Sequence, residues 1–298
     1  MNKTVKRFLW PLVMLRRWHD AYLRKHNPEK LFSIWHYRAT GEYLNIDNPK
    51  TLDDKIAYMA FRSDTSEWTR LADKVRVREY VEECGFGDYL PKLYGTWERA
   101  DDIDFDSLPN AFVIKTNNAS ATNILVRDKS KADINRIRKQ LDEWMKIDYG
   151  YRTCQPHYSR IKPLILAEEF LGLNEMGGGK FLIDFKLFCI NGHPEFVQVM
   201  SGRKENSHSF DVNVMDMEWH EHPEYCSEAH PRATDIKKPQ SLQKMIEIAT
   251  KLSASYPFVR VDFYEICGKP IFGEMTFTPG FSSLSGKFQK QIGQQLKI

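Results

Sequence analysis

The spacing of apolar residues predicts both helices and strands along this chain. Apolar positions recur at helical intervals in three segments, at residues 71–84, 133–147 and 241–252. Asp133 and Ser241 begin the second and third segments, where their side chains can cap the first turn of a helix. We therefore expect three amphipathic helices that each bury one face.

Strand patterns occupy other parts of the chain. Two short apolar runs and two longer hairpin-like segments show them, at residues 111–115, 164–167, 181–200 and 259–276. The alternating stretch that begins at Phe181 ends at Ile190, and Asn191 and Gly192 follow it, a pair that favours a tight hairpin turn. The last segment turns near Gly268. Strands mixed with helices predict an α+β protein.

Two acidic residues are predicted to face each other in the last hairpin. Alternate side chains of a strand share a face, and Asp262 and Glu274 lie equally far from Gly268. Like charges opposed across a sheet destabilise it, and a divalent cation removes that repulsion. Two carboxylates suit Mg²⁺. The alternative interpretation is a surface hairpin with solvated acids, one of them neutralised by Arg260.

Several cations border the predicted strands. Lys115 ends a strand and opens residues 116–123, whose small polar side chains and backbone N–H groups could close over phosphates. Lys186 shares a strand face with Asp184, and Arg203 follows the partner strand. Cations that converge on one cleft would suit a triphosphate. The GxxxxGK[ST] motif is absent from the sequence, which excludes a P-loop fold.

Composition limits the class of protein. The chain has 298 residues, 42% hydrophobic and 28% charged, which fits one large enzyme or two to three packed lobes. A net charge of +3 is too small to indicate nucleic-acid binding. The five cysteines are scattered, odd in number and never in CxxC, so a disulfide framework is not expected and a reducing cytoplasm fits best.

The first 25 residues are basic, with seven lysines and arginines against Asp20 as the only acid. The apolar run at residues 8–15 is shorter than the ~20 residues of a spanning helix, and it has neither the flanks nor the cleavage site of a signal peptide. It is either a helix packed on the body or a segment resting on the inner face of an anionic membrane. The basic and aromatic residues behind the second interpretation are Arg7, Trp10, Arg16, Arg17 and Trp18.

Two further motifs are weighed as alternatives. Zinc could be held by His220, His222, Cys226 and His230, but their spacing matches no standard site and the segment is polar and loop-like. Asp104 and Asp106 form a DxD of the kind that glycosyltransferases use for metal and nucleotide sugar. They lie in an acidic run before a strand, which favours an exposed loop.

The order of these features resembles the ATP-grasp superfamily, and within it the TupA-like ATP-grasp family, associated with teichuronopeptide and capsular polysaccharide biosynthesis. The resembling segments span about residues 48–280 and read NPKTLDDKIAYM, LADKVRVREYV, DFDSLPNAFVIKTN, IKPLILAEEFLG, DFKLFCINGHPEFVQV and FVRVDFYEICGKPIFGEMTFTPG. The resemblance implies an ATP-grasp fold, in which two α+β lobes clasp ATP. A helical extension at residues 1–70 would precede a small lobe at 71–171 and a large lobe at 172–298.

The resemblance also implies roles for individual residues. Phosphate contacts would come from Lys74, Lys115 and Ser120, and the hinge that reads adenine from Glu168, Glu169, Phe170 and Leu171. Cations near the transferred phosphate and the reacting atoms would be Lys186, Arg203 and Arg260, and the Mg²⁺ ligands Asp262, Glu274 and Thr276. Two departures stand out. The loop after Lys115 lacks the usual lid glycines, and Thr276 stands where many ATP-grasp enzymes have a metal-binding Asn.

The reaction implied is ATP-dependent joining of a carboxylate to an amine through an acyl-phosphate, with ATP and Mg²⁺ as cofactors. The expected partners are an amine or amino acid and a hexuronate of a cell-surface polysaccharide or its precursor, and no nucleic acid. Two alternatives stay open. One is a glycosyltransferase of the same pathway that uses Asp104 and Asp106, and the other is an inactive scaffold that binds ATP.

Overall fold

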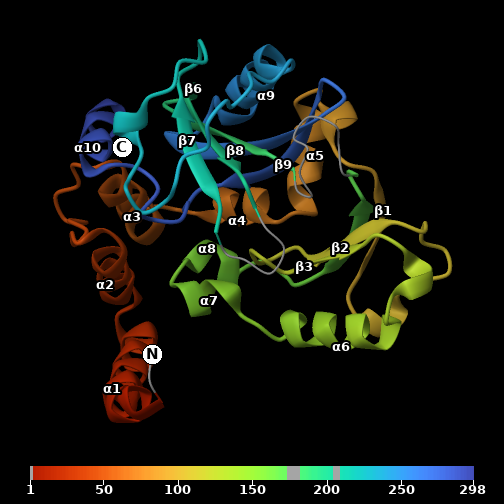
Figure 1. Ribbon diagram of the computed structural model, residues 1–298, viewed down its shortest axis with the longest axis horizontal. Coiled ribbons are helices and arrows are strands. Elements are labelled where there is room, and N and C mark those ends of the chain that lie inside the picture. Colours follow the sequence, from red (N-terminus) through yellow and green to blue (C-terminus); the bar gives the residue numbers. More distant parts are fainter. Residues whose placement is uncertain (1–2, 173–181, 204–208) are drawn as a thin grey trace.

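The computed structural model describes residues 3–172, 182–203 and 209–298, with side chains from residue 10 onward (Figure 1). Its α-helices are α1 Lys3–His26, α2 Pro28–Thr40, α3 Leu52–Arg62, α4 Ser66–Ala72, α5 Arg76–Glu83, α6 Ile134–Met145, α7 Tyr149–Thr153, α8 Pro156–Ser159, α9 Leu242–Ser253 and α10 Gly286–Gln295. Short 3₁₀ turns lie at Gly87–Tyr89, Ala100–Asp102, Lys129–Lys131 and Pro223–Tyr225.

The strands form two antiparallel sheets (Figure 1). The four-stranded sheet has the order β1-β4-β2-β3, from β1 Leu93–Trp97, β2 Phe112–Thr116, β3 Asn123–Val126 and β4 Ile165–Glu169. The five-stranded sheet has the order β7-β6-β5-β8-β9, from β5 Asp184–Ile190, β6 His193–Ser201, β7 Asp211–Met215, β8 Phe258–Ile266 and β9 Lys269–Thr276. The prediction of an α+β protein with N-terminal helices is confirmed.

The predicted strands are present with shifted ends. The apolar runs at 111–115 and 164–167 become β2 and β4, and β5 and β6 form the predicted hairpin. Asn191 and Gly192 both have positive φ, at 51° and 83°, as a tight two-residue turn requires. The described strand starts at Asp184, and Phe181 lies outside the described residues.

Two of the predicted helices begin where the sequence indicates, and they begin differently. The Asp133 side chain accepts a hydrogen bond from the backbone N–H of Arg136 (2.9 Å), as an N-cap does. Ser241 precedes α9 but does not cap it, which corrects the prediction. Its backbone N–H and its hydroxyl both donate to Glu265, at 2.7 and 2.5 Å, so the serine ties the helix start to β8 instead.

The predicted helix at 71–84 is two helices. α4 ends at Ala72 and α5 begins at Arg76. Asp73 accounts for the break, because its carboxylate accepts hydrogen bonds from the backbone N–H groups of Val75 (2.8 Å) and Arg76 (3.3 Å). Lys74 therefore stands in a turn rather than on a helix surface.

The largest core surrounds the five-stranded sheet. Fully buried aromatic and aliphatic residues of β5, β6 and β8 pack with apolar residues of α3, α4, α5, α9 and α10. A smaller core joins the four-stranded sheet to α6, and a third joins the end of α1 to α2 and α3. These contacts place α5 against the large sheet. The division of the chain at residues 70 and 171 stays a prediction.

Candidate active site

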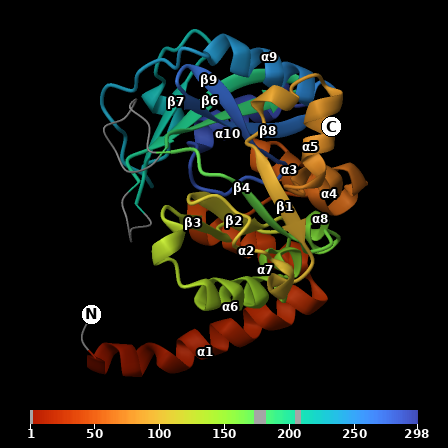
Figure 2. The same ribbon diagram turned by 90° about the vertical axis from the view of Figure 1, so that its right-hand side faces the viewer.

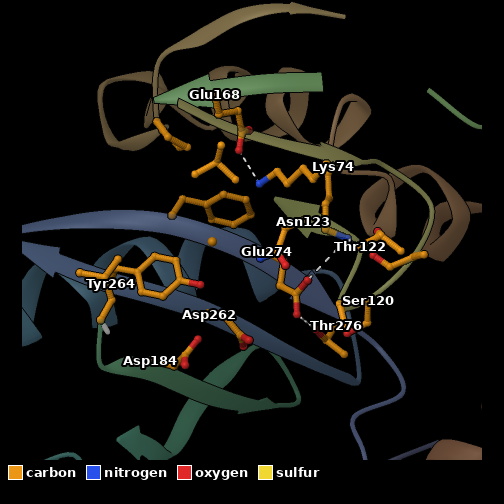
Figure 3. Close-up of a pocket in the computed structure, with 18 of the residues that line it drawn as sticks. Lys74, Ser120, Thr122, Asn123, Glu168, Asp184, Asp262, Tyr264, Glu274 and Thr276 are labelled. Carbon is orange, nitrogen blue, oxygen red and sulfur yellow. Dashed lines mark hydrogen bonds and ion pairs between the residues drawn. The ribbon is translucent and has the colours of Figure 1, made fainter. Parts of the chain in front are cut away.

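A cavity of about 660 Å³ lies between the two sheets, with residues from both in its walls (Figure 3). In Figure 3, Lys74 and Glu168 lie on one side, and Asp184, Asp262 and Tyr264 lie on the other. Every residue that the ATP-grasp resemblance assigns to a site lines this cavity, namely Lys74, Lys115, Ser120, Glu168, Glu169, Phe170, Leu171, Lys186, Arg203, Arg260, Asp262, Glu274 and Thr276. Segments spread over two hundred positions of the chain thus meet in one place, and their roles stay predictions.

The hairpin of β8 and β9 brings Asp262 directly opposite Glu274. Its turn is centred between Cys267 and Gly268, both with positive φ, rather than on Gly268. That turn alone would pair Asp262 with Gly273. A bulge between Asp262 and Phe263 shifts the register by one residue and restores the predicted pair. Gly273 lies so close to β8 that a Cβ there would sit 3.1 Å from the Asp262 carbonyl oxygen.

Asp262 is buried and fully paired with cations. Arg260 donates to it from Nε (2.6 Å) and Nη2 (2.7 Å), and Lys186 donates from Nζ. At 4% exposure the carboxylate is not a solvated surface acid. Arg260 does neutralise it, as the alternative interpretation anticipated. Repulsion between the opposed acids is therefore already relieved by the protein's own cations, so repulsion alone does not require a metal.

Glu274 is held in its ionised form. Burial raises the pKa of its carboxyl group, but Lys74, Lys186 and Arg260 outweigh that effect and lower the pKa to about 2. Thr276 also donates a hydrogen bond to it from Oγ1 (3.1 Å). The Lys74 ammonium is 3.9 Å away and the Arg260 guanidinium 3.4 Å away.

These oxygens fit Mg²⁺. Mg²⁺ in enzymes is commonly bound by one or two carboxylates, with substrate phosphates and water completing its shell. Asp262 and Glu274 supply two such carboxylates, and the hydroxyl of Thr276 lies beside them. Among residues 3–172, 182–203 and 209–298, no group of three or more His, Cys, Asp or Glu side chains is placed to hold a metal. A metal here would depend on oxygens from a bound ligand.

Lys74, in the turn between α4 and α5, and Lys115, on β2, line another part of the cavity wall. Lys74 donates from Nζ to the carbonyl oxygen of Ala119 (2.7 Å), in the loop that contains Ser120. Burial lowers the pKa of the Lys74 ammonium. Lys115 forms an ion pair with Glu168, which also accepts a hydrogen bond from Arg78 (3.1 Å). Each lysine thus already has an acceptor that a phosphate could replace.

The loop after Lys115 is held by its own hydrogen bonds. Thr116 donates from Oγ1 to Thr122 Oγ1 (2.7 Å), and its backbone N–H donates to the Thr122 carbonyl (3.1 Å). Ala121 has a positive φ of 59°, a conformation that glycine adopts more readily. The absence of lid glycines is therefore accommodated by a strained alanine and a threonine pair.

The segment at residues 168–171 continues from β4 along the cavity wall. The Glu168 carboxylate forms ion pairs with Lys115 and Arg78. The backbone N–H of Glu169 donates to the carbonyl of Lys92 (2.9 Å). The Arg127 guanidinium lies over the ring of Phe170, 5.4 Å from its centroid. Polar backbone and apolar side chains thus occur together here, as a site for a heteroaromatic base requires.

Lys186 and Arg203 meet at an acid whose role the sequence did not indicate. Arg203 donates from Nη2 to Asp184 Oδ2 (2.8 Å), and the Lys186 ammonium lies 3.6 Å from Asp184 Oδ1. The partly buried Tyr264 stands near Asp184 in the cavity wall (Figure 3). The strand pattern placed Asp184 and Lys186 on one face, and that arrangement is present.

Sequence reasoning missed one wall of the cavity. Tyr149, Gln155 and Tyr158 line it from the short helices α7 and α8 and the link between them. Thr278 donates from Oγ1 to Gln155 Oε1 (2.9 Å), which joins this wall to the chain after β9. Helices of five and four residues have too little periodicity to be recognised from sequence. The only available signal was that Thr278 follows the acidic hairpin.

The residues of the two alternative motifs lie elsewhere. Asp104 and Asp106 do not line the cavity, and Asp104 instead accepts a hydrogen bond from the backbone N–H of Asp106 (3.1 Å) in its own turn. His220 and His222 both contact Asp216, at 3.0 and 3.2 Å. Cys226 directs its thiol at backbone carbonyls. Among the described residues no three His, Cys, Asp or Glu side chains are placed to hold a metal, so the alternative zinc motif does not form a site.

Comparison with known proteins identifies similar chains. A family described as TupA-like ATPgrasp matches residues 54–297. An L-amino acid ligase from Bacillus licheniformis has a TM-score of 0.46 at 15% identity, over 77% of this chain and 48% of that one. The ATP-grasp ligase PsnB, complexed with minimal precursor, has a TM-score of 0.43 at 10% identity, over 80% of this chain and 63% of that one.

A D-alanine–D-alanine ligase from Bacillus anthracis has a TM-score of 0.43 at 13% identity, over 76% of this chain and 63% of that one. The chain thus spans about half the length of the Bacillus licheniformis ligase and under two thirds of the other two. No curated protein matches it.

Proposed function

Since the chain belongs to the TupA-like ATP-grasp family, we propose that it is an ATP-dependent ligase that joins a carboxylate to an amine. One observation carries the proposal. A single cavity gathers cations from both sheets and ends at two opposed carboxylates that suit Mg²⁺. Binding of this kind is what phosphoryl transfer needs, since its catalysis is mostly positioning and neutralisation of charge.

In this proposal, the cations exchange protein partners for phosphates. Lys74 would leave the Ala119 carbonyl and Lys115 would leave Glu168, so both could hold the phosphates of ATP. Adenine would lie along residues 168–171. Asp262 and Glu274 would hold Mg²⁺, which neutralises charge on the phosphates.

The chemistry would run in two steps. An oxygen of the substrate carboxylate attacks the γ-phosphorus, and the bond from that phosphorus to the β-phosphate oxygen breaks, giving ADP and an acyl-phosphate. The amine nitrogen then attacks the acyl carbon, the bond to phosphate breaks and the nitrogen loses a proton. Arg260 and Lys186 are buried cations that could hold the negative charge on the attacked group, where low polarity strengthens the interaction.

We further propose that the carboxylate belongs to a hexuronate of a cell-surface polysaccharide or its precursor, and that the amine is an amino acid or a related compound. The family resemblance supports this choice. Arg203 and Arg260 in the cavity wall would suit an anionic sugar. All five cysteines are free, which fits a reducing cytoplasm, where ATP is also available.

Phosphate release from ATP, measured across a panel of uronates and amino acids, tests the proposal, with hydroxylamine added to trap the acyl-phosphate as a hydroxamate. We expect a hydroxamate with one uronate when the amine is omitted, and an amide when it is present. The surface variant Lys237→Met should behave as the unsubstituted protein, and Arg260→Met should lose at least about 100-fold in rate. ATP binding without phosphate release from any pair would indicate a scaffold. Stabilisation by nucleotide sugars but not by Mg-ATP would indicate a glycosyltransferase.

A further inference from the structure

Only the last turns of helix α1 pack against the body of the protein, and its earlier turns extend away from it. Leu23, 6% exposed, packs against α2, whereas every residue from 10 to 19 is exposed. Figure 2 shows α1 running along the lower edge of the molecule and beyond it. The exposed turns of α1 therefore contribute nothing to the three hydrophobic cores, and their sequence needs another explanation.

The exposed part of α1 is unusually apolar. Seven of the twelve large hydrophobic side chains that are exposed in the described part of the chain belong to this helix, namely Trp10, Leu12, Val13, Met14, Leu15, Trp18 and Tyr22. Trp18 is 79% exposed and Trp10 61%. Single exposed apolar residues are ordinary on a protein surface, but a cluster of them marks a contact with something else.

Four of these seven residues form a stripe on the side of the helix away from the body, whereas Leu12 and Val13 lie on the side of Leu23 and Asp20. Trp10, Met14, Trp18 and Tyr22 are spaced four residues apart, so they form one stripe. Asp20 and Leu23, which attach α1 to α2, lie on the opposite side of the helix. The stripe is thus directed away from the contact that anchors the helix.

The charges of α1 are arranged around this stripe. Arg17 lies along its edge and Arg16 on the far side, whereas Arg24 packs against the body over the rings of Trp35 and Tyr151. Asp20, the only acidic residue of the helix, is bound by Arg38 of α2 through two hydrogen bonds of 2.6 and 2.9 Å. Since that acid is neutralised within the protein, the free part of the helix presents only positive charge.

We propose that α1 is an interfacial helix that binds an anionic phospholipid surface, a function separate from ligation. Trp10, Trp18 and Tyr22 would lie at the level of the headgroups, where amphipathic rings are favoured. Arg17 would pair with lipid phosphates, and the charge of the exposed Arg16 would add to the attraction. No helix in the described part of the chain is long and apolar enough to cross a bilayer, so the contact is with the surface.

A second copy of this chain fits the stripe less well. Two stripes packed face to face would bring Arg17 of both copies close to the seam, and like charges there repel. Charge complementarity therefore favours a lipid surface.

Sedimentation with vesicles tests the proposal. The protein should pellet with vesicles of phosphatidylcholine containing about a quarter phosphatidylglycerol and not with pure phosphatidylcholine, and high salt should release it. In the double variant R16E/R17E the partition coefficient should fall at least about 30-fold, which is about 2 kcal/mol at 1.4 kcal/mol per decade. W10A/W18A should lower it at least about tenfold.

Two further variants control for charge and for aromatic surface. Lys237→Glu with Lys238→Glu makes the same change of charge at exposed positions away from α1, and Tyr43→Ala removes an exposed ring from the body. Both should bind vesicles as the unsubstituted protein does, and far-ultraviolet circular dichroism should be unchanged in all variants. Equal pelleting of R16E/R17E and the Lys237 and Lys238 variant would overturn the proposal. So would a concentration-dependent dimer in analytical ultracentrifugation that W10A/W18A abolishes.

Discussion

Replacing Asp262 by asparagine should separate metal binding from ATP binding. The carboxylate accepts hydrogen bonds from Arg260 and Lys186 in a buried part of the cavity wall. Asparagine keeps the shape and one acceptor oxygen but removes the charge. If Asp262 holds Mg²⁺, the variant should still bind ATP through Lys74 and Lys115, but added Mg²⁺ should raise its affinity for ATP only slightly.

The cost to stability follows from the partners that remain. Breaking a buried ion pair by removing one side costs about 3–5 kcal/mol. Here Asp184 is still 3.6 Å from Lys186 and Glu274 is 3.4 Å from Arg260, so both cations keep an acid nearby. We therefore expect a loss of about 2–3 kcal/mol, equivalent to a fall in Tm of roughly 4–12 °C for a chain of this size.

Calorimetric titration with ATP, in excess EDTA and then in excess Mg²⁺, measures the effect. In the unsubstituted protein Mg²⁺ should raise the affinity, and in Asp262→Asn the two affinities should be nearly equal. Metal-free ATP should bind the variant at least as tightly, because Arg260 and Lys186 are freed for phosphate. Asp184→Asn is the matched control, since it removes an acid beside Lys186 that is not among the proposed metal ligands. The reasoning is refuted if Asp262→Asn weakens ATP equally under both conditions, or if Asp184→Asn also abolishes the Mg²⁺ effect.

Three other substitutions should change the stability of the protein in ways that the structure predicts. Burial raises the pKa of Glu274 but neighbouring cations lower it to about 2, against an ordinary 4.5, so its contribution to stability is present above pH 4.5 and is lost as pH falls toward 2. The difference in urea unfolding between the unsubstituted protein and Glu274→Gln should therefore shrink across that range. Burial lowers the pKa of His157 to about 3 from 6.5, so below pH 6.5 protons bind the unfolded chain in preference. His157→Phe should flatten the stability profile between pH 6.5 and 3 by up to about 1.4 kcal/mol per pH unit, as seen in chemical unfolding at each pH. Gly273→Ala should force β9 away from the Asp262 carbonyl, costing about 1–3 kcal/mol in thermal unfolding and reducing the Mg²⁺ effect on ATP affinity.

Local patterns were enough to predict the acidic hairpin. Two-residue periodicity and a glycine in the turn indicate strands and their approximate centre, so the pairing of Asp262 with Glu274 was predicted. The mechanism of that pairing was not, because a turn centred between Cys267 and Gly268 and a bulge at Gly273 compensate each other. A bulge shifts which residues of the two strands pair, but it leaves no visible change in the alternation of apolar and polar residues along the sequence.

Tertiary contacts decided the features that the sequence did not reveal. Helical spacing runs through residues 71–84, but Asp73 breaks the helix while accepting a hydrogen bond from Asn117 (2.9 Å), 44 positions away. Ser241 has the right residue type for a cap, yet it donates to a glutamate of another element. In both cases the side chain has several possible hydrogen-bond partners, and in the structure it bonds to a residue that is distant in sequence. The wall formed by Gln155 and Tyr158 escaped prediction because its short helices show too little periodicity.

The ion pairs of the cavity explain how its residues could stay folded and still bind a charged nucleotide. In this structure Lys115 is paired with Glu168, Lys186 with Asp262 and Arg203 with Asp184. Mg-ATP carries both kinds of charge, so its phosphates could take over the cations while its metal takes over the released carboxylates. The affinity for Mg-ATP then depends on the free energy of the new contacts less the free energy of the ion pairs that they replace. A variant that lacks one carboxylate should consequently lose stability and yet bind metal-free ATP more tightly, a combination that simple damage to the site would not produce.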